Sequence, residues 1–208
     1  MSDDKSRDEL LIHMYGQMFR DIEKHVITVW HSCALVVGVF LALLLTGQGA
    51  MDQDVGAALT LVLVAWSVAH NLDASYWYNR NLVIIGNIER QFLRKSDLKE
   101  VHYYFGTHRP RNSMITLLKV QVWLAAGIAV VVVGQQVAQT LSSGPRLLTA
   151  LPGIVLVVGL VLIARLKRNR DASYREFLGN SPGLRIDTGT IEYGPGHGHR
   201  SPPSEAVV

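Results

Sequence analysis

The sequence is poor in cysteine and in the motifs that carry chemistry. Cys33 is its single cysteine, so an intrachain disulfide is excluded. It lies in an apolar run, where burial disfavours the reactive thiolate. The chain has no glycine-rich phosphate loop and no Ser/His/Asp or Cys/His set with credible spacing. These absences favour a protein that is not an enzyme, with no catalytic residue and no metal or resident cofactor.

Charged residues are also scarce. They make up 18% of the chain, against about a quarter in soluble domains. Val55–Ala69 and Val120–Pro145 contain no formal charge at all, and runs of this kind approach the ~20 residues that cross a bilayer. The N-terminus, MSDDKSRDE, lacks the basic-then-apolar pattern of a cleavable signal peptide. The first apolar run, from Val26, would therefore act as an uncleaved anchor.

The pattern of apolar runs predicts an all-α integral membrane protein with four transmembrane helices and a cytosolic helical layer. The predicted spans are Val26–Thr46, Val55–His70, Val120–Leu141 and Leu147–Leu166. The regions are an amphipathic cytosolic helix (1–25), a first transmembrane hairpin (26–71), a cytosolic helical segment (72–112), a second transmembrane hairpin (113–167) and a largely disordered cytosolic tail (168–208).

Two helix boundaries rest on local signals. Asn112 or Ser113 can cap the third long helix. The second long helix has two readings. It either continues beyond the membrane or breaks at Asn71–Asp73, where Asp73 would cap a new helix. The sequence leaves both readings open.

The distribution of Lys and Arg predicts the orientation. Nearly all of them lie in the N-terminus, the central segment and the region after Leu166, whereas the two short opposite loops hold only Arg146. Short loops are where the positive-inside rule applies best. We therefore expect a multi-pass protein of the cytoplasmic (inner) membrane with both termini in the cytoplasm.

Two helix faces suggest partners besides the lipid bilayer. Ala34, Gly38 and Ala42 share one face of the first span, and small residues at this spacing let helices approach closely. The second face repeats apolar residues at three- and four-residue steps in the cytosolic segment: Leu82, Ile85, Ile88 and Phe92. We expect the first face to pack helices in a homo-oligomer, and the second to dock the N-terminal helix, a second subunit or another protein.

Two histidines are candidates for a haem site. His31 and His70 lie near the cytoplasmic ends of antiparallel spans, from which two imidazoles could ligate a haem axially. The alternative is that each histidine lies at the membrane interface, where histidine is tolerated, and forms a hydrogen bond with a backbone carbonyl or Ser32. Haem is therefore kept as the second hypothesis.

Basic and aromatic residues mix in the central segment. The candidate contacts for anionic headgroups or phosphates are Arg94, Lys95, Lys99, Arg109 and Arg111. The ordinary positive-inside flank explains the same residues. Neighbouring acids dilute the charge, so we expect no nucleic-acid binding.

A short motif occurs twice. Asp73-Ala74-Ser75-Tyr76 follows the second span, and Asp171-Ala172-Ser173-Tyr174 follows the fourth. Three alternatives explain the repetition: a duplicated hairpin, chance, or convergent interface chemistry. Altogether the sequence favours a non-enzymatic, oligomeric membrane protein that acts as a scaffold, sensor or effector, with pore formation as one form of effector.

Overall fold

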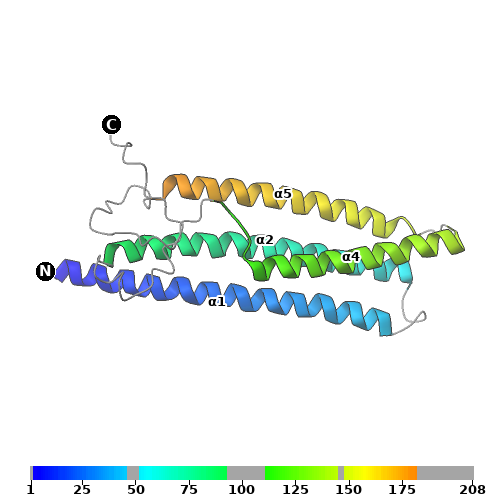
Figure 1. The fold of residues 1–208 in the computed structure, drawn as a ribbon, viewed down its shortest axis with the longest axis horizontal. Coiled ribbons are helices and arrows are strands. Elements are labelled where there is room, and N and C mark those ends of the chain that lie inside the picture. The colour runs from blue at the N-terminus through cyan, green and yellow to red at the C-terminus, as the bar shows by residue number, and fades with distance from the viewer. Residues whose placement is uncertain (1, 46–51, 93–110, 145–147, 182–208) are drawn as a thin grey trace. The chain divides into compact units, whose positions relative to one another are not determined.

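The described residues of the chain are all helical. A computed structural model describes residues 2–45, 52–92, 111–144 and 148–181, and within these ranges there are four α-helices and no strand (Figure 1). The helices are α1 (Ser2–Leu45), α2 (Gln53–Phe92), α4 (Thr116–Ser143) and α5 (Leu151–Asn180). The predicted all-α class is confirmed for this part of the chain.

Three of these helices contain stretches that are long and apolar enough to cross a membrane. Within the described ranges the helices that contain such a stretch are Lys5–Ala42, Gln53–Glu89 and Thr116–Ser142. The uncharged part of α5 is shorter, because it starts with the helix at Leu151 and ends at Ala164, before Arg165. The structure thus supports three of the four expected spans by length and composition.

Two helices continue where the sequence suggested a change of element. α1 passes from the amphipathic segment into the first apolar run without a break, since neither glycine nor proline occurs between Gly16 and Gly38. α2 runs unbroken through Asn71–Asp73. The Asn71 side chain donates to the carbonyl of Ser67 at 2.9 Å, which satisfies its amide inside the helix. At 40 residues, α2 is about 60 Å long.

The ends of α4 and α5 differ from expectation. Ile115 is the N-cap of α4 and makes no side-chain capping bond, so the predicted capping by Asn112 or Ser113 is wrong. The physical reason is competition, because the Asn112 side chain accepts a hydrogen bond from Asn79 instead. α5 continues to Asn180, so residues 168–180, the first part of the predicted, largely disordered tail, are helical. Residues 182–208 of that tail lie outside the described residues.

The chain divides into two compact units. The polar unit comprises Met1–His25, Tyr76–Ser113 and Ala172–Val208; the apolar unit comprises Val26–Ser75 and Met114–Asp171. Each of α1, α2 and α5 contributes one segment to each unit. Most of the polar and aromatic contacts between helices that form the candidate site lie in the polar unit.

The apolar unit has two buried clusters along its helices. The larger is built from Val36 of α1, Leu61 and Val64 of α2, and Ala125, Ile128 and Val132 of α4, with Val155 and Leu156 of α5 packed against it. The smaller consists of Val29, Ala74 and Leu118. α5 also approaches α2 closely, since a Cβ placed on Gly159 would lie 3.1 Å from the Cβ of Ala65.

Candidate functional site

The polar unit joins α1 to α2 through a half-buried hydrogen bond. The Tyr15 hydroxyl donates to Oε1 of Glu89 at 3.2 Å, and Glu89 is only 9% exposed. Burial raises the pKa of Tyr15 to about 12, and the charge of Glu89 and the hydrogen bond to it act in the same direction. The phenol therefore stays protonated at neutral pH.

An arginine held between aromatic rings links α2 to α5 in the same unit. The Arg80 guanidinium lies 5.1 Å from the ring centroid of Trp77 and 5.5 Å from that of Phe177. Contacts of this kind are each worth about 0.5–1 kcal/mol at exposed sites. His25 of α1 stacks on Trp77 with ring centroids 6.1 Å apart and planes 8° apart. Three helices thus meet at Trp77 and Arg80.

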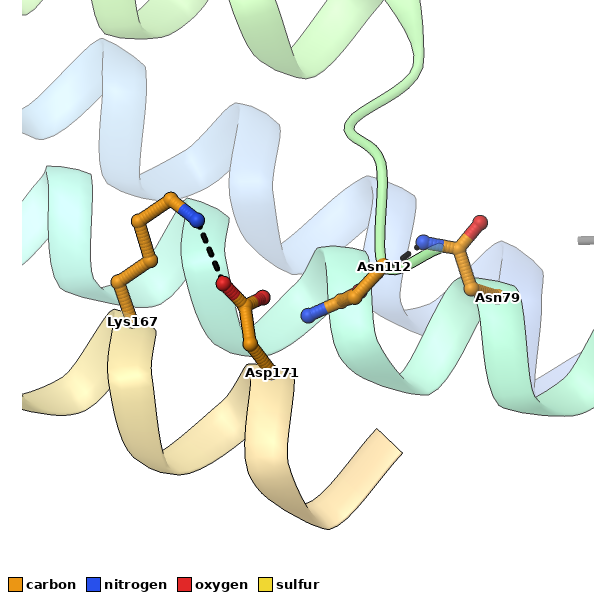
Figure 2. Close-up of polar contacts among 4 residues, drawn as sticks. All are labelled: Asn79, Asn112, Lys167 and Asp171. Carbon is orange, nitrogen blue, oxygen red and sulfur yellow. Dashed lines mark hydrogen bonds and ion pairs between the residues drawn. The ribbon is translucent and has the colours of Figure 1, made fainter. Parts of the chain in front are cut away.

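The repeated motif places its two tyrosines in contact. Tyr76 and Tyr174 form an edge-to-face pair with centroids 6.3 Å apart, and Tyr174 is 1% exposed. Within the apolar unit, Asp73 of the first copy pairs with Arg170, the residue before the second copy. Asp171 pairs with Lys167 of its own helix at 2.6 Å (Figure 2). These contacts support shared interface chemistry, and a duplication of the hairpin stays a prediction.

Asparagines of α2 bind distant parts of the polar unit. Asn79 is fully buried and donates to Oδ1 of Asn112 at 3.0 Å (Figure 2) and to the Ser113 carbonyl at 2.9 Å. Asn87 donates to the Ser181 hydroxyl at 3.0 Å. Sequence reasoning missed both asparagines. The available signal was their presence inside an apolar helical pattern, where an amide needs a partner.

The predicted docking residues are mostly buried within the chain. Leu82, Ile85 and Ile88 are 6%, 0% and 5% exposed, whereas Phe92 is 39% exposed. They lie in the α2 segment that Tyr15 and His25 of α1 and Phe177 of α5 contact. These contacts favour the N-terminal helix, among the predicted occupants, as the partner of this face.

The predicted helix-packing residues lie on the surface of the chain. Ala34, Gly38 and Ala42 are all exposed on α1. A Cβ added to Gly38 would meet nothing within 4 Å. The face is therefore available to another chain or to lipid, and its use in an oligomer stays a prediction.

The two candidate haem ligands differ in their surroundings. His31 is exposed. His70 is half-buried and stacks on Trp66 with centroids 5.8 Å apart. Its Nε2 is buried without a hydrogen-bond partner. Among the described residues, no group of three or more His, Cys, Asp or Glu could hold a metal ion.

The predicted phosphate or headgroup contacts fall mainly in an undescribed segment. Arg94, Lys95, Lys99 and Arg109 lie outside the described residues, and Arg111 is exposed. Contact of these residues with anionic groups stays a prediction.

Taken together, the polar unit defines a class of site: an interface between helices, built from aromatic, amide and phenol contacts. No protein-family model matches the chain, and no curated protein or solved structure is similar to it at a significant level.

Proposed function

We propose that this chain is a non-enzymatic protein of the cytoplasmic membrane with four spans and both termini in the cytoplasm. It acts as an oligomeric scaffold, sensor or effector, and its polar unit is the cytosolic helical layer through which it meets partners. Lipid covers the helices of the apolar unit.

One observation carries the proposal: the apolar unit exposes large apolar side chains and buries polar ones. Its exposed side chains include Leu141, Trp123 and Val130, at 83%, 75% and 71% exposure. Its buried side chains include Asn71 and Gln121, at 0% and 4%. Large exposed apolar surfaces mark contact with membrane or protein. A bundle in lipid faces its apolar side chains outward and keeps polar ones inside.

Carbonate extraction of membranes tests the insertion, and single-cysteine labelling in a Cys33→Ser background tests the topology. The full chain should remain in the membrane pellet at alkaline pH. A cysteine replacing Ser6 should react with an impermeant thiol reagent only from the cytoplasmic side, and one replacing Ser142 only from the opposite side. Release of the chain into the supernatant would exclude the membrane placement, and labelling of both positions from one side would exclude the four-span topology.

A matched glycine pair tests the oligomer. Gly38 of α1 and Gly127 of α4 are both exposed, and an added Cβ at either meets nothing within 4 Å. Gly38→Ile and Gly127→Ile should therefore both leave the fold of the single chain intact. If the small-residue face packs subunits, Gly38→Ile alone will dissociate the oligomer in mild-detergent size-exclusion chromatography with light scattering. A monomeric wild type would exclude the oligomer.

Haem binding at His31 and His70 is the alternative function. The buried, unpartnered Nε2 of His70 supports it, and the exposure of His31 leaves that imidazole open to a ligand. Protein purified after growth with a haem precursor should then show a Soret band that His70→Ala abolishes. Purified wild type without Soret absorbance would exclude this alternative.

A further inference from the structure

The apolar unit contains a buried polar layer between its two apolar clusters. One polar side chain comes from each of three helices: Ser32 of α1, Asn71 of α2 and Gln121 of α4, which are 3%, 0% and 4% exposed. The burial of all three points to a shared role.

Contacts at the far end of the unit set the register of α2 against α4. Gln136 donates to Asp54, and Gln139 donates to Gln53, so the two helices run antiparallel. Counting inward from these pairs brings Asn71 level with Gln121. The smaller cluster gives the same register, because it joins Ala74 of α2 to Leu118 of α4.

The same counting brings Ser32 into the layer. The smaller cluster consists of Val29, Ala74 and Leu118. A step of three residues, close to one helical turn, leads from these positions to Ser32, Asn71 and Gln121. A step of four residues in the same direction along α1 and α4 reaches Val36 and Ala125 of the larger cluster. The polar layer thus has apolar side chains on both sides along the bundle.

The layer holds hydrogen-bonding groups that the described residues do not satisfy. Ser32 donates to the Val29 carbonyl at 2.8 Å, and Asn71 donates to the Ser67 carbonyl at 2.9 Å. Oδ1 of Asn71 and both Oε1 and Nε2 of Gln121 are buried without a hydrogen-bond partner. Buried polar groups without partners are rare and call for a bound molecule or ion.

The chemistry of the unsatisfied groups selects the ligand. Gln121 offers a donor and an acceptor, and Asn71 offers an acceptor, so the ligand must both donate and accept hydrogen bonds. A metal cation can coordinate the two amide oxygens but cannot accept a hydrogen bond from Nε2 of Gln121, and a simple anion cannot donate to either oxygen. A charged ligand would also be disfavoured in an uncharged layer between apolar clusters. Water meets these conditions, and buried waters typically make about three hydrogen bonds to such groups.

We propose that Ser32, Asn71 and Gln121 form a buried hydration site that binds water between the two apolar clusters of the unit. The site does not rest on the proposed function, since its residues are buried by the chain itself. The bound water satisfies the amides of Asn71 and Gln121 and holds α1, α2 and α4 together at this level.

Water-edited nuclear magnetic resonance tests the site in the full chain, reconstituted in phosphatidylcholine vesicles. Magnetisation from water should reach the side-chain amides of Asn71 and Gln121 about as fast as that of Gln17, which is exposed on α1. The backbone amide of Ile128, in the larger apolar cluster, should receive none. If Gln121 receives as little as Ile128, the layer is dry and the proposal is overturned. Transfer to Ile128 as fast as to Gln121 would also overturn it, because the water would then fill the core without a discrete site.

A matched pair of glutamine variants identifies the ligand residue. Gln121→Met keeps the length of the side chain and removes both polar atoms, so it should reduce the transfer from water to Asn71. Gln135→Met changes an exposed glutamine of the same helix and should leave that transfer unchanged. Undiminished transfer in Gln121→Met would overturn the assignment of Gln121. If extraction shows that the chain is not in the membrane, the same measurement in solution still decides the hydration site.

Discussion

The polar and apolar units use buried polar side chains in different ways. In the polar unit these side chains bond across elements, as Tyr15 does to Glu89 and Asn79 does to Asn112. In the apolar unit, Gln136 also bonds across helices, to Asp54, but Ser32 and Thr60 donate to carbonyls of their own helix, three and four residues earlier. The hydroxyls of Ser32 and Thr60 therefore bond within a helix, whereas the Tyr15 hydroxyl of the polar unit joins two helices.

The two units also differ in the polarity of their exposed side chains. The apolar unit exposes Trp123 and Val130 and buries Asn71 and Gln121. Both units bury apolar side chains, but α1 in the polar unit exposes charged ones such as Arg20 and Glu23. This contrast is what two surroundings would select, because exposed apolar surface is unfavourable in water but not in lipid. The predictions below test that contrast, from the largest effect to the smallest.

The largest effect is expected from a charge in the core of the polar unit. Ile85→Asp places a carboxylate at a position that is 0% exposed, and a buried unpaired charge should lower the free energy of unfolding by about 4 kcal/mol. The variant should also fail to assemble with the partner that docks on this face. It should still remain in the membrane on carbonate extraction. The change in the free energy of unfolding is measured by denaturant titration, with circular dichroism as the readout. The control is Ile12→Asp at an exposed position of α1 in the same unit, with a change below about 0.5 kcal/mol.

An arginine on the surface of the apolar unit should have the next largest effect. Val130→Arg and Ile12→Arg both change exposed apolar residues, at 71% and 63% exposure, in the apolar and polar units respectively. If lipid surrounds Val130, the arginine raises the apparent free energy of insertion by about 2.5–3.5 kcal/mol. Ile12→Arg should leave insertion unchanged. A translocation reporter fused after α4 measures both, and equal behaviour of the two variants would remove the basis of the contrast.

Loss of a bond between helices should have an intermediate effect. Tyr15→Phe removes the donor to Glu89 and should destabilise the polar unit by about 1–2 kcal/mol, as measured by denaturant unfolding. A loss below about 0.5 kcal/mol in Tyr15→Phe would contradict the role assigned to Tyr15.

The same tyrosine predicts a dependence on pH. The pKa of Tyr15 is about 12 in the folded chain, against an ordinary value of 10.0. Because the folded value is the higher, the contribution of Tyr15 is fully present below pH 10 and is lost as the pH rises towards 12. Unfolding measured across this range should show a steeper loss of stability in the wild type than in Tyr15→Phe. Parallel curves would contradict the assignment.

The smallest effect is expected for a hydroxyl bonded within its own helix. Thr60 is 2% exposed and donates to the Gly56 carbonyl at 2.9 Å. Thr60→Val keeps the shape and leaves that carbonyl in the helical ladder, so stability should change by less than about 0.5 kcal/mol. A loss as large as that of Tyr15→Phe would show that Thr60 joins helices after all.

The sequence predicted the features that depend on local pattern. The all-α class follows from the periodicity of apolar residues, and the continuity of α2 was one of two open readings. The break was suggested by Asp73, which could cap a new helix. In the structure the amide of Asn71 bonds back to Ser67, and the helix continues. Local competition of this kind has two nearly equal outcomes, and the sequence alone does not choose between them.

The contacts between distant residues could not be predicted. Tyr15 and Glu89 are 74 residues apart, and their meeting depends on how α1 and α2 align. The capping prediction at Asn112 failed for the same reason, because Asn79, 33 residues earlier, takes the side chain as an acceptor. The burial of Gln121 likewise follows from its register against Asn71. Such pairings are set by tertiary packing, which single-sequence patterns do not contain.

The glycines of the helices predict how the sequence can vary. In a deep mutational scan, Gly38 and Gly127 should each accept alanine without loss of the folded chain, because an added methyl group meets nothing within 4 Å. Gly159 should be depleted even as alanine, since its methyl group would lie 3.1 Å from Ala65. Of these three glycines, Gly159 alone acts as a spacer between two helices. A compensating Ala65→Gly change should restore the lost variants.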